Sequence, residues 1–391
     1  MRLTPTESER RLQEEIRGFL AAERPDAARL PHALDARMEA LRAWQARCYA
    51  AGYVGRAWPL EFGGGGRPGA EQIVIDQELA AAGAPEFANT VGLDVLGPSL
   101  LRFGTDAQRR RYIPAILAAE EIWCQGFSEP DAGSDLASLR TRADERGEEF
   151  VLSGQKTWVS WGQFARWCGV LARTHDAGPR HRGISMLIVD MRSPGIEVRP
   201  MTQITGHAEF CELFLDEVVV PRANLLGELG DGWKIAMHTL GHERGTAALP
   251  RQVKLRTWLD RAVRVAAERT VDGAPLIDDP AVQTALARAL VAVEVLRHHA
   301  YRTVGEFLNG GAVGPDSSSV KLLMAEAEQR LAATALDVLA PTLEHADAEA
   351  VEENEFWHET YLYSRAATIY GGTQQIQRNI IADRVLGLPQ E

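Results

Sequence analysis

The sequence predicts a mainly α, α+β fold in three parts: an N-terminal helical domain at residues 1–122, a middle domain with a small β-sheet or barrel at 123–231, and a C-terminal four-helix bundle at 232–391. Apolar residues recur at helical spacing in the long segments at both ends. The middle segment alone carries short β-rich runs separated by Gly, Pro and Asp. A chain of 391 residues is long enough for two or three packed units.

Capping patterns mark helices in the N-terminal part. Thr4, with Glu7 three residues later, is predicted to cap a first helix, and Thr105 with Gln108 is predicted to cap another that runs to about residue 119. Further helices are expected at residues 38–51 and 71–82.

A run of four glycines, residues 63–66, lies between these helices. Gly64, Gly66 and Gly69 fit the spacing Gly-x-Gly-x-x-Gly, but no Lys-Ser or Lys-Thr follows and no strand clearly precedes them. We therefore expect a mobile surface turn here rather than a phosphate loop.

The middle segment is expected to form five strands, at residues 150–153, 167–172, 184–190, 196–199 and 210–215. Their close spacing argues against βαβ units. None of them leads into a glycine-rich dinucleotide turn, so a Rossmann site is not indicated.

The C-terminal part has four helical segments. Residues 233–268 contain Pro250, which should kink or divide the helix, and further helices are expected at 280–308, 317–339 and 359–370. Gly371 and Gly372 end the last of these, and the helix resumes at Gln374. The acidic stretch 344–355 is expected to be solvated.

The composition excludes several classes of protein. Forty-two Lys and Arg against 54 Asp and Glu give a net charge of −12, which argues against nucleic acid as a partner. The four cysteines have no metal-ligand spacing, which suits reduced thiols in the cytoplasm. No secretory run and no window of about 18 apolar residues is present, so we expect a soluble cytoplasmic protein without a membrane span.

One histidine pair has metal-ligand spacing. His238 and His242 would share a helical face, but Thr239 stands where a zinc-protease motif has Glu. We therefore predict no metal site.

The middle segment also carries the features that a bound flavin needs. Backbone N–H groups at the Gly133-Ser134 turn can hold a pyrophosphate. Trp158 can lay its face along an isoalloxazine ring, and the hydroxyls of Ser128 and Ser160 can bond the edge of that ring. A plain turn with a core tryptophan is the alternative for either feature alone.

Motifs along nearly the whole chain resemble those of the acyl-CoA dehydrogenases. The run 126–138 is similar to the first signature of that family, and Ile369 to Pro389 is similar to its C-terminal segment. The resemblance extends, in the family's order, to Trp58-Pro-Leu-Glu-Phe-Gly-Gly64, Phe103-Gly-Thr105, Arg109-Arg-Arg-Tyr-Ile-Pro114, Val218-Val-Val-Pro221 and Leu226-Gly-Glu-Leu-Gly-Asp-Gly-Trp233.

The resemblance implies an FAD enzyme that forms an α,β double bond in an acyl thioester. Most members carry the catalytic Glu directly before a Gly-Thr near the C-terminus, but Gly371 stands at that position here. A minority carry it as a Glu-Arg pair on the first helix of the C-terminal bundle, and Glu243-Arg244 matches that pair. We predict Glu243 as the base and Arg244 as a residue of the substrate end, since helical neighbours point about 100° apart.

The matching positions give a set of site residues. Gly371 is expected to donate its backbone N–H to the thioester carbonyl, and its lack of a side chain leaves space for a bulky or branched acyl group. The other predicted substrate contacts are Ser134 and Gly372. The predicted cofactor contacts are Phe127, Ser128, Gly133, Ser134, Trp158, Ser160, Arg269, Thr373, Gln374 and Gln375.

The adenosine end of the FAD site departs from the family. Asp272-Gly273 replaces a Phe-Gly, residues near Asp279-Pro280 replace a His-Gln, and residues 337–343 replace a glycine-rich loop. Either this half of the site is rebuilt, or a dissimilar partner chain supplies its contacts.

The resemblance also implies partners and a role in lipid metabolism such as β-oxidation. These partners are an acyl-CoA or acyl-carrier substrate, an electron-transfer flavoprotein, and other subunits in a homodimer, homotetramer or heterotetramer with a related chain. Two alternatives stay open: a flavin monooxygenase or oxidase of the same fold, and a degenerate, non-catalytic subunit of a heteromeric dehydrogenase.

Overall fold

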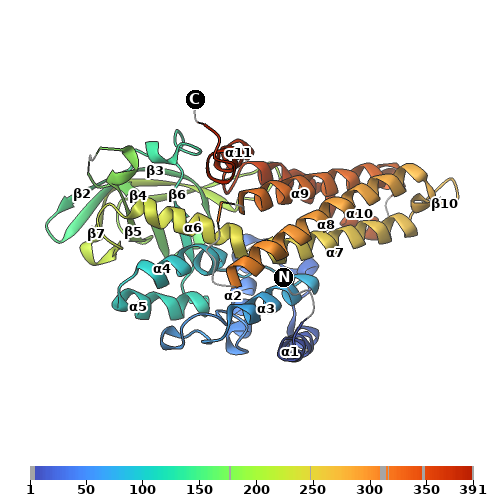
Figure 1. The fold of residues 1–391 in the computed structure, drawn as a ribbon, viewed down its shortest axis with the longest axis horizontal. Coiled ribbons are helices and arrows are strands. Elements are labelled where there is room, and N and C mark those ends of the chain that lie inside the picture. Colours follow the sequence, from blue (N-terminus) through green and yellow to red (C-terminus); the bar gives the residue numbers. More distant parts are fainter. Residues whose placement is uncertain are drawn as a thin grey trace. The chain divides into compact units, whose positions relative to one another are not determined.

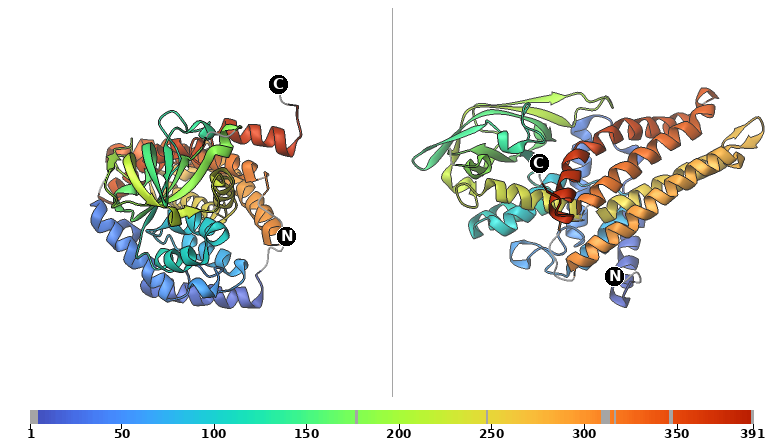
Figure 2. Two further views of the ribbon diagram at one scale, coloured as in Figure 1. Left: turned by 90° about the vertical axis from the view of Figure 1, so that its left-hand side faces the viewer. Right: turned by 45° about the horizontal axis from the view of Figure 1, so that its top comes forward.

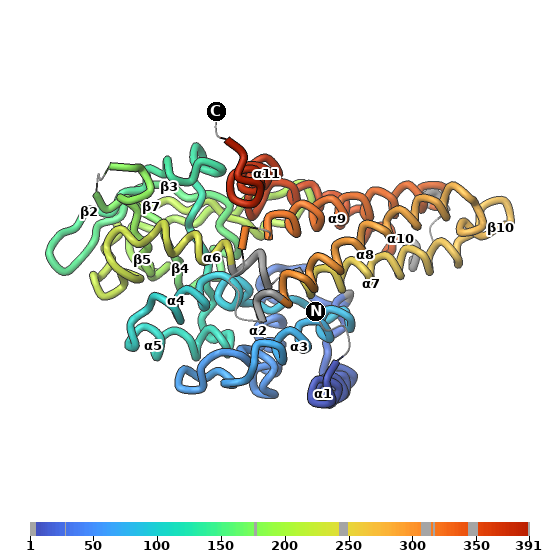
Figure 3. The backbone as a smooth tube through the Cα atoms, in the orientation of Figure 1, coloured from blue at the N-terminus to red at the C-terminus, as the bar shows by residue number. Residues whose placement is uncertain are grey.

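A computed structural model describes the backbone of residues 5–175, 178–246, 248–308, 314–315, 317–345 and 348–389. Within these ranges, side chains are described except at residues 28, 242–246, 248, 306–308, 343–345 and 348–350. The chain forms two compact units, one of Met1–Leu20, Ile73–Ala84 and Arg244–Glu391 and the other of Ala21–Gln72 and Pro85–Glu243. Figure 3 traces the course of the chain.

Helix α1 (Glu7–Glu23) begins two residues later than the capping pattern at Thr4 predicts. The hydroxyl of Thr6 accepts a hydrogen bond from the backbone N–H of Glu9 (3.2 Å), and the Glu9 carboxylate accepts one from the N–H of Thr6 (2.6 Å). Thr6 and Glu9 therefore form the capping box. The prediction of Thr4 was wrong about the cap, and Thr4 itself lies outside the described residues.

Three of the remaining N-terminal helices lie close to their predicted positions, and the helix Gly97–Phe103 was not predicted. The capping box predicted at Thr105 and Gln108 is confirmed at the start of α5, where both of its hydrogen bonds form. The helices are α2 (Leu34–Ala50), α3 (Gly69–Ala81), α4 (Gly97–Phe103), which follows the π-helical turn Val91–Leu96, and α5 (Asp106–Leu117).

The glycine run 63–66 forms a packed turn rather than a phosphate loop. A Cβ atom at Gly65 would lie 2.6 Å from the carbonyl oxygen of Arg56, and one at Gly64 would collide with the backbone of Trp58. The N–H of Gly66 donates to the carbonyl of Trp58 (2.8 Å). Glycine is needed here because two stretches of backbone approach each other closely.

An eight-stranded sheet forms the middle of the chain, in the order β6-β7-β3-β2-β4-β5-β8 with β1 beside β4. Its strands are β1 (Trp123–Gly126), β2 (Arg142–Arg146), β3 (Glu149–Ser160), β4 (Trp167–Arg173), β5 (Ile184–Asp190), β6 (Ile196–Met201), β7 (Phe210–Pro221) and β8 (Leu225–Leu226). Figure 2 (left) shows the strands, in green, fanning across one another as a twisted sheet. The five predicted strands are confirmed.

Most neighbouring strands run antiparallel, which agrees with the expectation against βαβ units. Strands β1 and β4 are parallel along their whole pairing, with Trp123 opposite Trp167. Fully buried apolar side chains fill the sheet's core, including Phe150, Leu152, Val170, Leu187 and Leu213.

The C-terminal helices form a bundle within their own unit. Helices α7 (Ala248–Glu268), α8 (Pro280–Leu308), α9 (Ser317–Leu339) and α10 (Ala348–Ser364) run alongside one another (Figure 1). Leu255, Val293, Leu331 and Trp357 are among the residues buried between them. The predicted four-helix bundle is therefore confirmed.

Pro250 lies in the first turn of α7, and α6 (Gly232–Thr246) ends before it. The predicted division of the segment is confirmed, and proline is tolerated at this place because first-turn N–H groups have no helical partner. Between α7 and α8, the strands β9 (Thr270–Val271) and β10 (Ala274–Pro275) form a hairpin. Asp272 and Gly273 make its turn, both with positive φ (54° and 83°).

The acidic stretch expected to be solvated is exposed at Glu352 and Glu355, as predicted, but one of its carboxylates is buried in the bundle. Glu353 lies in α10 with only 7% of its surface exposed. Its carboxylate accepts hydrogen bonds from Trp357 Nε1 (2.7 Å) and pairs with Arg261 of α7 (2.8 Å). The stretch reads as polar along the sequence, but a guanidinium partner makes the burial of its carboxylate favourable.

No helix among the described residues is long and apolar enough to cross a membrane.

We expect the four thiols to be unreactive in the native protein, since Cys48, Cys124, Cys168 and Cys211 are all buried and free of disulfides. Burial raises the pKa of Cys48 to about 12 and also raises the pKa of Cys124 and Cys211, so thiolate is scarce. An aromatic disulfide reagent at pH about 8 should release no chromophore from the folded chain and four equivalents after denaturation. Fast release from the folded chain would contradict this burial.

Candidate functional site

An exposed tryptophan on strained backbone marks one face of the sheet. Trp158 lies at an irregularity of β3, where the pairing with β7 shifts register between Lys156 and Val159. Its φ is +58°, a conformation that L residues rarely adopt and that costs about 1–3 kcal/mol. Its side chain is 60% exposed and makes an edge contact to Phe210 at a ring-centroid distance of 6.1 Å. Strain that presents a large apolar ring to solvent indicates a binding surface.

Two serines lie close to this tryptophan in the backbone. The carbonyl of Ser128 accepts a hydrogen bond from the N–H of Thr157 (3.0 Å), so Ser128 lies beside the residue that precedes Trp158. Ser160 ends β3 two residues after Trp158 and is paired with Phe210. Both serines are half-buried, and the structure brings together on one unit the ring and the two serines that the sequence predicts.

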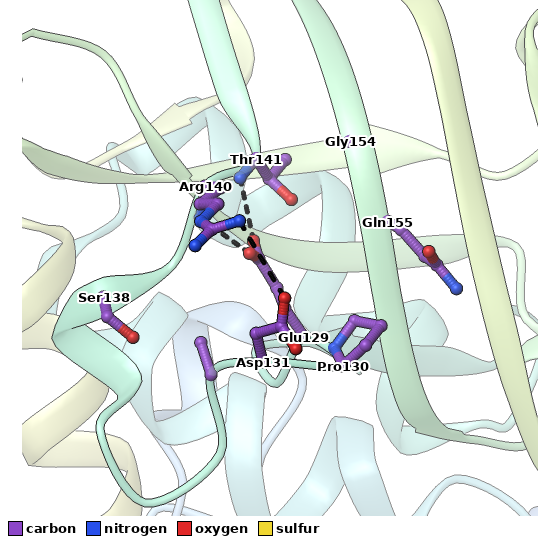
Figure 4. Close-up of a pocket in the computed structure, with 9 residues that line it drawn as sticks. Glu129, Pro130, Asp131, Ser138, Arg140, Thr141, Gly154 and Gln155 are labelled. Atoms are coloured by element: carbon purple, nitrogen blue, oxygen red, sulfur yellow. Dashed lines mark hydrogen bonds and ion pairs between the residues drawn. The ribbon is translucent and has the colours of Figure 1, made fainter.

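A buried ion pair anchors the loop that carries Ser128. Lys156 of β3 is fully buried, and its Nζ lies 2.8 Å from Glu129 Oε1 and 3.1 Å from the carbonyl oxygen of Phe127. The Glu129 carboxylate also accepts hydrogen bonds from the backbone N–H of Arg140 (2.6 Å) and of Thr141 (2.9 Å), as Figure 4 shows. One carboxylate therefore holds both ends of the loop 127–141 against β3.

The pKa values of the pair follow from burial and mutual attraction. Burial by itself would raise the pKa of Glu129, but Lys156 and the hydrogen bonds to the carboxylate outweigh it and lower the pKa. Burial lowers the pKa of Lys156, and the attraction of Glu129 opposes that shift. The Glu129 carboxylate is therefore ionised at neutral pH.

A cavity of about 270 Å³ opens beside this carboxylate. Figure 4 shows its lining: Glu129, Pro130, Asp131, Ser138, Arg140, Thr141, Gly154 and Gln155. Arg140 and Asp131 are both exposed and lie 3.9 Å apart in a weak ion pair. The Gly133-Ser134 turn belongs to the same loop and is exposed, and a Cβ atom at Gly133 would meet no atom within 4 Å. A ligand can thus approach the backbone of this turn closely.

Helix α6 carries the predicted base. Glu243 and Arg244 lie in its last turn, but their side chains are outside the described residues, so the assignment of Glu243 stays a prediction. On the described part of α6, Nδ1 of His238 is 3.5 Å from the hydroxyl of Ser99, and its ring packs edge-on against Phe103 at 5.3 Å.

Burial and the nearby Arg102 lower the pKa of His238, so its ring is neutral at physiological pH. The neutral, half-buried imidazole of His238 therefore packs against Phe103. The side chain of His242 lies outside the described residues. Within the part of the chain that is described, no group of three or more His, Cys, Asp and Glu could hold a metal ion.

The predicted thioester residues form a glycine turn in the other unit. Gly371 (φ +62°) and Gly372 (φ +96°) connect the 3₁₀ helix Arg365–Thr368 to α11 (Gln374–Ile380). Two successive left-handed residues explain why glycine occupies both positions. Thr373 caps α11, because its hydroxyl accepts a hydrogen bond from the N–H of Ile376 (3.2 Å).

Gln374 and Gln375, also predicted as cofactor contacts, start α11; the first residue is half-buried and the second is exposed.

Arg269, predicted to contact the FAD pyrophosphate, is bound by the segment that replaces the glycine-rich loop. Its Nη1 donates to the hydroxyl of Thr342 (2.8 Å) and to the side-chain oxygen of Asn354 (3.1 Å). Thr342 lies in the 3₁₀ helix Ala340–His345. The guanidinium of Arg269 is therefore hydrogen-bonded to other residues of its own unit.

Sequence reasoning missed Glu129 and Lys156 as the anchor of this site. No local signal marked Lys156 as buried, because it lies beyond the predicted strand 150–153 and a register shift between Leu152 and Gly154 interrupts the alternation of β3.

Comparison with known sequences and structures identifies the class of protein. Sequence models of the acyl-CoA dehydrogenase N-terminal, middle and C-terminal domains match residues 6–120, 124–218 and 230–386. The chain therefore belongs to the acyl-CoA dehydrogenase family and is an oxidoreductase of that class.

The similarity to individual relatives covers most of the length of each chain. The chain is 43% identical to acyl-CoA dehydrogenase IpdE1 of Mycobacterium tuberculosis, over 90% of this chain and 89% of that protein. Among solved structures, the Tcur3481-Tcur3483 steroid ACAD matches with a TM-score of 0.87 and 28% identity, covering 100% of both chains. The ChsE4-ChsE5 complex from Mycobacterium tuberculosis matches with a TM-score of 0.86 and 30% identity, again covering 100% of both chains.

We expect Lys156→Met to destabilise the protein by about 3–5 kcal/mol, because Glu129 would be left buried without its counter-charge. Urea unfolding followed by tryptophan fluorescence measures the loss. The double variant Lys156→Met/Glu129→Gln removes both charges and should recover a large part of it. A loss below about 1 kcal/mol in the single variant would show that the pair resembles an exposed ion pair instead.

Proposed function

We propose that this chain is an FAD-dependent dehydrogenase that introduces an α,β double bond into an acyl-CoA thioester. The observation that carries this assignment is the exposed indole of Trp158, held on strained backbone between Ser128 and Ser160. A solvent-exposed ring with two hydroxyls beside it suits a flat heteroaromatic ligand with polar edges. The family to which the chain belongs consists of flavoproteins that use FAD.

The residues of the sheet unit fit the flavin half of FAD. Trp158 would stack on the isoalloxazine, Ser128 and Ser160 would bond its polar edge, and Phe127 would support the loop from its buried position. The exposed Gly133-Ser134 turn offers backbone N–H groups to the pyrophosphate. We assign Thr373, Gln374 and Gln375 to the same cofactor, and Arg269 to the pyrophosphate of an FAD bound by a neighbouring subunit.

In this reaction Glu243 takes the proton from the α carbon of the thioester. Arg244 lines the substrate end, and Ser134 and Gly372 contact the substrate. The backbone N–H of Gly371 donates to the thioester carbonyl and stabilises the enolate that forms when the proton leaves. FAD, when bound, accepts the hydrogen lost from the β carbon and passes its electrons to an electron-transfer flavoprotein.

The acyl group that we propose is bulky and polycyclic, of the steroid type. Gly371 has no side chain where most members carry Glu, which leaves room beside the thioester. Two solved relatives support this choice, since the Tcur3481-Tcur3483 protein and a single-site variant of it are both described as a steroid ACAD.

We further propose that the enzyme works with a related, dissimilar subunit. Residues 337–343 replace the family's glycine-rich loop, and Arg269 is bound by Thr342 from that replacement. A partner chain would then supply contacts to the adenosine end of FAD. The solved ChsE4-ChsE5 relative is itself a complex of two chains.

Glu243→Gln should abolish desaturation while the protein keeps its fold and its FAD. Glutamine preserves the shape of the side chain but cannot accept the α proton, so we expect a loss of at least about 10³-fold in kcat. Steady-state oxidation of a steroid-acid CoA thioester with an artificial electron acceptor measures it. Glu39→Gln, an exposed carboxylate of α2, is the matched control and should leave kcat unchanged. Wild-type turnover in Glu243→Gln would remove the base assignment.

Trp158→Ala should weaken FAD binding about five- to tenfold, because one aromatic stacking contact contributes about 1 kcal/mol beyond its buried area. Titration of the apoprotein with FAD, followed by flavin absorbance, gives the dissociation constant. Trp158→Phe keeps an aromatic face and should bind nearly as well as the wild type. Equal affinity in the alanine variant would contradict stacking at this position.

A further inference from the structure

A buried lysine of the C-terminal bundle lies against the glycine turn. Lys321 of α9 is only 6% exposed. Its Nζ donates to the carbonyl oxygen of Ala367 at 2.7 Å and lies 4.0 Å from the centre of the Tyr370 ring. The ammonium thus contacts the residue that immediately precedes Gly371 and the backbone four residues before it.

A buried glutamine holds the same turn from the following helix. Gln377 of α11 is fully buried, and its Nε2 donates to the carbonyl oxygens of Gly371 (3.0 Å) and Gly372 (3.4 Å). Gln329 of α9 donates in the same way to the carbonyl of Ser364 (3.0 Å), where α10 ends. Side chains therefore bond carbonyl groups at several points along the passage from α10 to α11.

The turn needs such support because of its composition. The carbonyls at a helix end have no intrahelical partners, and glycine residues reach many backbone conformations at similar cost. A pair of glycines would not by itself hold one orientation of the Gly371 N–H. An oxyanion donor is effective only when it is held in place before the charge develops, and a displacement of about 1 Å can cost on the order of 10²-fold in rate.

We propose that Lys321 and Gln377 are positioning residues that hold the Gly371–Gly372 turn for enolate stabilisation at the thioester. Neither side chain needs to touch the substrate: each acts through the backbone of the turn, Lys321 before the glycines and Gln377 on their carbonyls. The positive charge of Lys321 adds a favourable field for the developing enolate. This role depends on the proposed function, in which the Gly371 N–H meets the thioester carbonyl.

The test separates removal of the α proton from the rest of the reaction. A steroid-acid CoA thioester with sulfur in place of the β carbon cannot lose the β hydrogen, so only exchange of the α proton remains. Its rate is followed in D₂O by mass spectrometry with the full-length, FAD-loaded protein. Steady-state kcat and KM of the unmodified thioester are measured beside it, together with thermal unfolding.

We expect Lys321→Met to lower the exchange rate and kcat on the order of 10²-fold, with KM changed less than about threefold and FAD retained. Lys321→Arg keeps a cation and hydrogen-bond donors at this position. Its exchange rate and kcat should be at least about tenfold higher than those of Lys321→Met. Gln377→Met removes the hydrogen bonds to the carbonyls of the turn. It should likewise lower kcat while KM changes little. It also tests the role of the turn if Lys321→Met does not fold.

Arg261→Met is the matched control. Arg261 belongs to the same bundle, lies 3.8 Å from the centre of the Phe356 ring and pairs with Glu353. Among the described residues, its hydrogen bonds and ion pairs go to Glu353 and none of them reaches the glycine turn. The variant should lower the unfolding temperature and leave the exchange rate unchanged.

Two results would overturn the role of Lys321: an exchange rate in Lys321→Met within about twofold of the wild type, or an equal loss in Arg261→Met, which would show a general effect of bundle stability. A wild-type protein that neither exchanges the α proton nor oxidises any acyl thioester would instead refute the proposed function. The two failures are therefore distinguishable.

Discussion

The ion pair of Lys156 and Glu129 is the constraint on which the sheet unit depends. Both charges are removed from water, so each is stable there only because the other is present. The same carboxylate receives two backbone N–H groups from the far end of its loop. This interaction therefore helps to place Phe127 and Ser128 beside β3, where the carbonyl of Ser128 accepts a hydrogen bond from the N–H of Thr157.

The bundle unit also contains carboxylates that are buried beside a cation. Arg251 pairs with the nearly inaccessible Glu328 between α7 and α9, and Arg261 pairs with Glu353 between α7 and α10. Lys321 differs from both, since its hydrogen bond goes to a backbone carbonyl and its ring contact goes to Tyr370. The first two cations join helices, whereas the third contacts the connection between α10 and α11.

Local patterns predicted most of the fold, and the exceptions have identifiable physical causes. The capping box at Thr105 was found because its two hydrogen bonds join residues three apart. The first helix was expected to be capped by Thr4, but the hydrogen bonds of the capping box join Thr6 and Glu9. Strands β1, β2 and β8 were not predicted because two of them are very short and β2 is mostly polar and exposed.

Ion pairs between residues that are far apart in the chain could not be predicted from the sequence. Glu353 is one carboxylate of an acidic stretch, and nothing nearby in the chain shows that Arg261, 92 positions away, will cover it. The residues of the middle segment that we propose as flavin contacts were predicted as a set from their types and order, whereas the ion pair of Lys156 and Glu129 was not predicted. The proposed flavin contacts lie on one β-rich segment. Lys156 and Glu129, by contrast, matter because they are buried, and their burial depends on the packing of the whole sheet.

The amino-acid sequence by itself determined the family, the order of helical and β-rich parts, and the residue types available to a flavin and a thioester. Those properties depend on composition, spacing and motifs that are local in the chain. Only the tertiary structure decided that Trp158 is exposed on strained backbone, that Lys156 is fully buried against Glu129, and that Lys321 contacts the residues leading into the glycine turn. Burial and contact between distant residues arise only when the whole chain packs, because water is excluded by all the neighbours together.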